Sequence, residues 1–138
     1  MSQQKVLSQV APFLIAALIC DVAVADPGTG KKSLIGIFDR VIVGKFPTQH
    51  SMSLYLKMTD AEGYYPLEIE YVYVNTGELL AKVVGEMEAK DRTVSSDVHM
   101  PFQALPIPKA GRYEFRVKAS NMFLGSAFMD AVQRQLPS

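Results

Sequence analysis

Side chains that alternate between apolar and polar constrain the fold of this chain more than any other feature of its sequence. Residues 51–58 read Ser-Met-Ser-Leu-Tyr-Leu-Lys-Met, so that every second side chain is large and apolar. Residues 112–119 read Arg-Tyr-Glu-Phe-Arg-Val-Lys-Ala and place charged residues between the apolar ones. Because successive side chains of a β-strand point to opposite faces, both segments predict strands with one face on a core and one in water.

Further segments predict strands on similar grounds. They are residues 10–20, 33–43, 67–74, 79–87 and 94–102. In these segments β-branched and aromatic residues either alternate with polar ones or form short apolar runs. The last segment, residues 126–136, is ambiguous, because its apolar side chains recur every four residues as in a helix although a turn-like sequence precedes it. We expect a final strand there, with a helix as the alternative.

Glycine and proline residues separate the expected strands at short intervals, which leaves little room for helices. A length of 138 residues is enough to bury one core without disulfides or a structural metal. We therefore expect a single all-β domain over residues 1–138, with residues 1–9 frayed. The expected fold is an antiparallel two-layer β-sandwich of immunoglobulin-like or C2-like type, with about eight strands.

Charge and cysteine content narrow the range of partners and compartments. The 14 lysine and arginine residues are balanced by 14 acidic residues, so no overall field draws the chain to nucleic acid or to an anionic membrane. Cys20 is the single cysteine and cannot form an intramolecular disulfide, which favours a reducing compartment. We expect a cytoplasmic protein with no nucleic-acid partner and no membrane partner.

The N-terminal segment also resembles a secretory signal in part. Lys5 precedes the apolar residues 10–20, and residues 23–25 are small enough for a cleavage site. Asp21 falls between the apolar run and that site, which departs from the pattern, and a buried strand explains the run better. The alternative is a secreted or periplasmic ligand-binding sandwich whose mature chain begins near Asp26.

The segment Asp-Pro-Gly-Thr-Gly-Lys-Lys-Ser at residues 26–33 resembles a phosphate-binding loop. Such a loop needs a first glycine, a hydroxyl directly after its lysine and a helix that follows. Here Ala25 replaces that glycine, Lys32 follows Lys31 where the hydroxyl belongs, and the next residues favour a strand. We expect a hairpin turn with hydrated lysines, and no nucleotide or other cofactor.

Two stretches of the sequence have a distinctive spacing. The first is Leu-Ile-Cys-Asp at residues 18–21, followed by Gly-Lys-Lys-Ser-Leu-Ile-Gly-Ile-Phe-Asp-Arg-Val at residues 30–41 and by Phe46-Pro47. The second is Leu-Pro-Ile-Pro-Lys-Ala-Gly-Arg-Tyr-Glu-Phe-Arg-Val at residues 105–117, a pattern shared by many immunoglobulin-like sandwiches. Together they resemble a bacterial and phage family of small uncharacterised β-sandwich domains. The resemblance implies a two-layer antiparallel sandwich whose first two strands form a hairpin around the glycine-rich turn, and it implies no catalytic residues.

Asp21 and Asp39 are the candidates for chemistry, since each follows an apolar strand and strand pairing could bring them together. Two facing carboxylates can act as a general acid and a general base, but strand-end aspartates commonly cap turns. His50 and His99 lack the further cysteine or histidine ligands that zinc requires. We therefore expect no catalytic residue and no metal site, and a small hydrolase built on the two aspartates is the alternative.

A row of basic residues follows one expected strand face. Its members are Lys109, Arg112, Arg116 and Lys118. Glu114 interrupts the row, and the aromatic side chains that would stack on nucleic-acid bases are expected on the opposite face. We interpret this row as a solvated strand face.

Four apolar or aromatic residues near predicted turns are candidates for contact with a partner. Met122 and Phe123 lie in one such turn, and Tyr64 and Tyr65 lie in another. Methionine and aromatic side chains are enriched in protein contacts. We expect a non-enzymatic module for protein binding or assembly, with a homodimer through a sheet edge as one possible arrangement.

Overall fold

The computed structural model describes residues 10–135 of the chain. These residues form nine β-strands and no helix, so the prediction of an all-β protein is confirmed for them. The strands are β1 Phe13–Ala25, β2 Lys32–Ile37, β3 Arg40–Val43, β4 Thr48–Thr59, β5 Gly63–Tyr73, β6 Glu78–Ala89, β7 Ser96–Ile107, β8 Gly111–Ala119 and β9 Met122–Gln133. The prediction that residues 1–9 are frayed concerns residues outside the described part.

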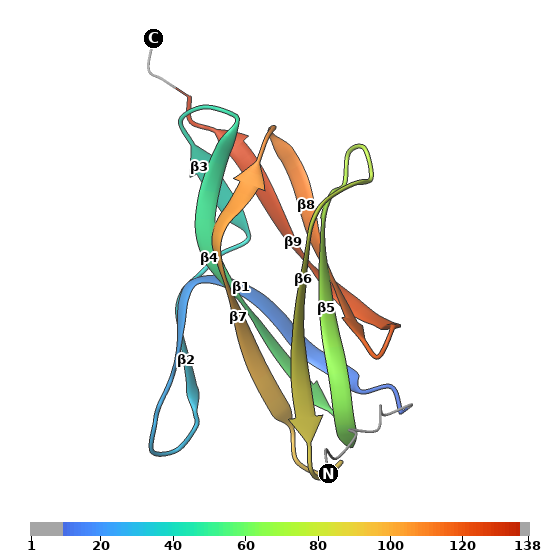
Figure 1. Ribbon diagram of the computed structural model, residues 1–138. Coiled ribbons are helices and arrows are strands. Elements are labelled where there is room, and N and C mark those ends of the chain that lie inside the picture. Colours follow the sequence, from blue (N-terminus) through green and yellow to red (C-terminus); the bar gives the residue numbers. More distant parts are fainter. Residues whose placement is uncertain (1–9, 136–138) are drawn as a thin grey trace, which may run out of the picture.

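The strands form two sheets that lie face to face (Figure 1). The first sheet has the order β2-β1-β4-β7 and the second has the order β3-β9-β8-β5-β6. Neighbouring strands are antiparallel except for β3, which runs parallel to β9 with Arg40 opposite Asp130. Each sheet therefore keeps two edge strands.

The strand count is nine instead of the expected eight or so, because residues 33–43 form two strands rather than one. Phe38 and Asp39 carry the chain from the first sheet to the second. The amide of Phe38 donates to the carbonyl of Ile19 in β1 at 2.9 Å, and the amide of Asp130 in β9 donates to the carbonyl of Asp39 at 2.9 Å. One short apolar segment thus belongs to both sheets, which local periodicity does not indicate.

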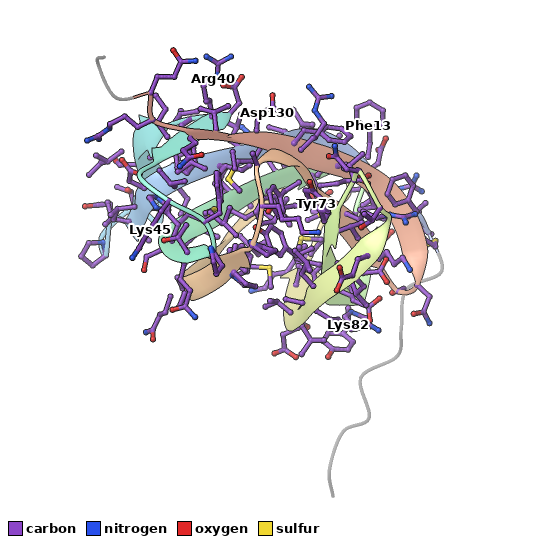
Figure 2. The ribbon with its side chains drawn as sticks, turned by 90° about the horizontal axis from the view of Figure 1, so that it is seen from above. Phe13, Arg40, Lys45, Tyr73, Lys82 and Asp130 are labelled. Carbon is purple, nitrogen blue, oxygen red and sulfur yellow. The ribbon has the colours of Figure 1, made fainter. Side chains whose placement is uncertain are left out.

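The alternating segments supply the core as predicted. The buried hydrophobic side chains of β4, β5 and β8 are Met52, Leu54, Leu56, Met58, Tyr65, Leu67, Ile69, Tyr71, Tyr73, Tyr113, Phe115, Val117 and Ala119. Tyr73 lies between the layers, whereas Arg40, Lys45 and Lys82 lie at the periphery (Figure 2). Each large apolar side chain buried in this way contributes about 1.5–3 kcal/mol of transfer free energy.

Tyrosine side chains in the core satisfy their hydroxyl groups with main-chain partners. The ring of Tyr71 stacks on that of Tyr113 with 5.4 Å between centroids, and its hydroxyl donates to the carbonyl of Pro106 at 2.9 Å. The hydroxyl of Tyr113 donates to the carbonyl of Lys109 at 2.6 Å and accepts from the amide of Lys109 at 3.2 Å. Burial raises the pKa of both phenols. These bonds let large amphipathic rings fill the core without unpaired polar atoms.

The glycine-rich segment is a hairpin turn, as predicted. Strands β1 and β2 pair with Val22 opposite Ile35, and their hairpin is seen at the lower left of Figure 1. The carboxylate of Asp26 accepts from the hydroxyl and the amide of Thr29, which lowers the pKa of Asp26. Lys32 begins a strand and not a helix. The segment therefore lacks the helix N-terminus on which a phosphate-binding loop depends.

The two ends of the described chain form strands. Strand β1 pairs with β2 on one side and with β4 on the other, and its Ile19 and Cys20 are buried. Cleavage near Asp26 would therefore remove an internal strand of the first sheet. Strand β9 runs through Gln133, so the strand expected after the last turn is confirmed and the helix alternative is wrong. Leu136, the last position of that pattern, lies outside the described residues.

Candidate functional site

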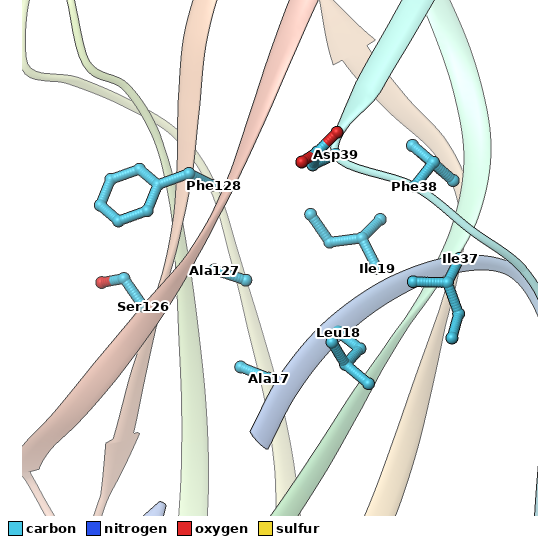
Figure 3. A pocket seen from close by; sticks show the side chains of 9 residues that line it. All are labelled: Ala17, Leu18, Ile19, Ile37, Phe38, Asp39, Ser126, Ala127 and Phe128. Carbon is cyan, nitrogen blue, oxygen red and sulfur yellow. The ribbon is translucent and has the colours of Figure 1, made fainter. Parts of the chain in front are cut away.

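An open pocket lies between the two sheets, at the side where β1 faces β9 (Figure 3). Its volume is about 400 Å³. It is lined by Ala17, Leu18 and Ile19 of β1, by Ile37, Phe38 and Asp39 around the crossing between the sheets, and by Ser126, Ala127 and Phe128 of β9. The lining joins segments that are more than a hundred residues apart in the chain.

The pocket lies where both sheets have an unpaired strand edge. Strand β2 pairs only with residues 20–25 of β1, and β3 pairs only with residues 130–133 of β9. Residues 13–19 and residues 122–129 therefore have a strand neighbour on one side alone. Residues 38–39, which cross from the first sheet to the second, cover this opening next to Ile19 and Asp130. No strand of residues 10–135 covers the rest of the opening.

The orientation of the main-chain groups follows from the hydrogen bonds at the crossing. The amide of Asp130 points to the β3 side, because it donates to the carbonyl of Asp39. Amide and carbonyl groups of every second residue point to the same side of a strand, so those of Phe128 and Ser126 also point to the open side. The carbonyl of Ile19 points to the β2 side, so the main-chain groups of Ala17 face the same opening. Both sheets thus direct into one pocket main-chain donors and acceptors that have no strand partner among residues 10–135.

Small side chains make room in this pocket. Ala17 packs on the core from β1, and Ala127 is buried on the core-facing side of β9. Larger apolar side chains form the rim, since 58% of Ile37 and 43% of Phe128 are exposed. An apolar side chain of moderate size that enters here would meet apolar atoms on both sides.

Asp39 is the charged residue that lines the pocket. Its side chain is exposed and lies at the upper end of the pocket, with the carboxylate directed towards β9 (Figure 3). Nearby polar groups have other partners: the hydroxyl of Ser126 donates to Glu114 at 2.5 Å, and Asp130 pairs with Arg112 at 3.1 Å. The pocket therefore combines an apolar floor, main-chain groups without a strand partner in the described part of the chain, and one negative charge.

Asp21 and Asp39 do not line a common pocket. Asp39 lines the opening between β1 and β9, whereas Asp21 lines two other hollows, one beside Gly36 and one beside Ser53. Both carboxylates are exposed. The arrangement does not provide the facing pair of carboxylates that the hydrolase hypothesis requires.

The histidines stand apart from other metal ligands. His50 packs edge-on against Phe38, with 6.1 Å between ring centroids, and His99 lies in β7 on the outer side of the first sheet. Among residues 10–135, no three histidine, cysteine, aspartate or glutamate side chains are grouped so that they could hold a metal ion.

The four predicted partner-binding residues differ in their surroundings. Tyr65 is fully buried and its hydroxyl donates to the carbonyl of Val10 at 2.8 Å, so it offers no surface and this part of the prediction is wrong. Tyr64 is partly exposed, and its hydroxyl donates to Glu86 at 2.9 Å. Met122 packs against the core. Phe123 is 54% exposed, although both residues belong to β9 and not to a turn.

Three members of the basic row, Arg112, Arg116 and Lys118, lie in β8 on the outer face of the second sheet, and acidic residues pair with Arg112 and Lys118, whereas Lys109 precedes β8. The ion pairs are Arg112 with Asp130 at 3.1 Å, Lys118 with Glu70 at 3.1 Å, and Lys118 with Glu68 at 4.0 Å. The expectation that the aromatic residues all face the other way is wrong. The guanidinium of Arg112 lies 5.4 Å from the ring centroid of Phe128, and that of Arg116 lies 5.3 Å from Phe123. The exposed rings thus have cationic partners within the protein.

Lys32 is not hydrated as expected, because it joins a polar cluster on the outer face of the first sheet. Its amino group lies 3.2 Å from Asp97, which also accepts a hydrogen bond of 2.9 Å from the hydroxyl of Tyr55. Burial, together with Asp97, raises the pKa of Tyr55 to about 12. Burial and the charge of Asp21 raise the pKa of the Cys20 thiol. Lys31, in contrast, is exposed.

The strand order and the pocket at the sheet edges define an all-β protein of two sheets with an open pocket between them. The chain belongs to a family of unknown function, DUF6941, whose model matches residues 15–130. A comparison with curated proteins finds no match.

Comparison with solved structures gives a match to the Pseudomonas fluorescens alkylpurine DNA glycosylase AlkC bound to DNA containing an abasic site analog. The two chains are 15% identical, with a TM-score of 0.46, over 84% of this chain and 30% of that one. This chain therefore corresponds to less than a third of that protein's length, and at this level the similarity says nothing of what this chain binds. In the described residues no helix is long and apolar enough to span a bilayer.

Proposed function

We propose that this protein is a non-enzymatic module that binds another protein through the pocket between β1 and β9. The observation that carries this proposal is the meeting of two unpaired strand edges in one apolar opening. Free strand edges are templates for pairing with another chain, and soluble proteins usually protect them with charge, proline or a covering segment. Residues 13–19 contain no charged residue. Such an edge is explained by a partner that covers it.

An immunoglobulin-like sandwich is part of the same proposal. Strand β8 lies between β9 and β5, and Tyr113 near its start bonds back to the main chain at Lys109. A tyrosine that bonds back in this way near the start of the corresponding strand is a hallmark of immunoglobulin-like sandwiches. Domains of this kind commonly present binding surfaces on a rigid two-layer scaffold. The single buried thiol of Cys20 supports a reducing compartment such as the cytoplasm as the place of action.

The test compares two substitutions of one residue. The amide of Ser126 faces the open side, so Ser126→Pro removes a donor that β8 does not use and blocks the addition of a strand. Ser126→Ala removes the hydroxyl but keeps that amide, and it is the matched control. In affinity purification from the native cell, we expect one protein to co-purify with the wild type and with Ser126→Ala and to be lost with Ser126→Pro. Equal recovery by all three proteins would contradict the proposed site.

A further inference from the structure

We propose that the ligand of this pocket is an extended protein segment that joins β9 as an additional strand, with an apolar side chain against Ala17 and Ala127 and a lysine or arginine beside Asp39. This inference rests on the proposed function, because it names the kind of partner that the same pocket takes.

The main chain defines the line along which the segment would bind. Strand β3 occupies the outer edge of β9 only from residue 130 onward, and the pocket begins where this pairing ends. Because the amides and carbonyls of Ser126 and Phe128 point along the same side as the amide of Asp130, a segment placed there continues the line of β3. An extended peptide that adds to a sheet edge obtains its affinity from such main-chain hydrogen bonds.

Side chains of the incoming segment would alternate between the core and the solvent. Those that point inward reach the space between Ala17 on β1 and Ala127 on β9, where both residues are alanine and the walls are apolar. Those that point outward lie beside Phe128 on the surface of the second sheet. The pocket therefore selects a segment with valine, leucine or isoleucine at alternate positions.

The negative charge of Asp39 predicts which kind of residue lies at one end of the bound segment. In the part of the chain that the structure describes, no ion pair or side-chain hydrogen bond engages the carboxylate of Asp39. A lysine or arginine at the end of the segment next to Asp39 would neutralise this carboxylate. A nucleic-acid backbone would instead bring phosphates to a negative group, which disfavours it.

A second copy of this chain fits the pocket less well than a different protein. A symmetric dimer through these edges would pair β1 or β9 with the same strand of the other copy. Residues 10–25 and residues 122–133 contain no lysine and no arginine, so this pairing would bring no cation from either strand to Asp39. The charge of the pocket thus favours a partner with a basic residue in its edge-binding segment.

Nuclear magnetic resonance titration of the isotopically labelled full chain tests this inference. The probes are two acetylated synthetic peptides, Lys-Val-Ser-Val-Ser-Val-Ser-Lys and the same peptide with glutamate at both ends. We expect the lysine peptide to shift the amide signals of Ala17, Ser126 and Phe128 and to bind about threefold more tightly than the glutamate peptide, as suits one exposed ion pair. Asp39→Lys should reverse this preference, whereas Asp91→Lys, at an exposed aspartate that does not line the pocket, should leave it unchanged.

Three results of the titration would overturn the inference. They are signal shifts confined to other surfaces, no binding of either peptide, and a preference that Asp39→Lys does not reverse. If wild type is a dimer by light scattering and Ser126→Pro is a monomer, a second copy occupies the edge and the inference is also wrong. Failure of the peptides while Ser126→Pro still loses the cellular partner would refute the ligand class alone and leave the proposed function intact.

Discussion

Substitution of Gly36 by alanine tests the close approach of the β2 main chain to the Asp21 side chain of β1. Gly36 has a φ of 70°, a left-handed conformation that costs other residues about 1–2 kcal/mol. A Cβ atom added there would lie 2.3 Å from Oδ2 and 2.9 Å from Cγ of Asp21. The carboxylate would have to leave its place, because real Cβ contacts are longer than this. Gly30 has a similar φ of 74°, but an added Cβ would meet no atom within 4 Å, so Gly30→Ala is a matched control.

The expected magnitudes follow from these two environments. The backbone strain at Gly30 is partly offset, since alanine lowers the entropy of the unfolded chain by the equivalent of about 0.4–1 kcal/mol. We therefore expect Gly30→Ala to lower the free energy of unfolding by about 1 kcal/mol. At Gly36, displacement of the Asp21 side chain into a less favourable rotamer adds about 1 kcal/mol more, which gives about 2 kcal/mol in total.

Urea unfolding followed by near-ultraviolet circular dichroism measures these differences, because the chain has tyrosines but no tryptophan. In a double-mutant cycle, Asp21→Ala should reduce the cost of Gly36→Ala towards that of Gly30→Ala, with a remainder from the Cβ atom of residue 21, which would lie 3.2 Å from the added Cβ atom. Equal costs at the two glycines in the wild-type background would refute the reasoning, since they would show that the Asp21 contact contributes nothing.

Three further predictions concern titratable and hydroxyl groups. The buried, high-pKa thiol of Cys20 should react with Ellman's reagent much more slowly in the folded protein than in urea, and equally fast reaction would contradict its burial. The pKa of Tyr55 is raised from 10.0 to about 12. The stability that the protonated phenol contributes is therefore fully present below pH 10 and is lost as the pH rises through 12. Tyr55→Phe keeps the ring but not the bond to Asp97, so its free energy of unfolding should fall less between these pH values than that of the wild type. Tyr113→Phe removes the hydroxyl that bonds to Lys109 at 2.6 Å and should cost about 1–2 kcal/mol in urea unfolding, with no loss expected if that bond is unimportant.

The sequence predicts strands best where one face is buried and the other is solvated. Segments such as 51–58 and 112–119 became β4 and β8 because burial of every second residue leaves a periodic signal. The same signal could have excluded Tyr65 from the surface, since it is in phase with the buried Leu67 and Ile69. The split of residues 33–43 could not be predicted, because it depends on which strands pair with each half and not on local periodicity.

Apart from Asp39, the residues of the candidate site were missed for a different reason. Ala17, Ser126 and Ala127 are ordinary strand residues that carry no recognisable motif. Their importance arises because pairing ends at residue 20 on β1 and at residue 130 on β9, and strand ends of this kind are set by tertiary structure. The usable signal was the absence of charge over residues 10–20, which is unusual for an edge that faces water.

Parallel pairing of β3 with β9 has a consequence for biosynthesis. It joins residues 40–43 to residues 130–133, so this ladder cannot form on the ribosome until the last strand has been translated. Folding of a sheet with such distant pairing is slow relative to local structure formation. During that interval β3 has emerged without its partner strand β9 and stays accessible to chaperones and to neighbouring nascent chains.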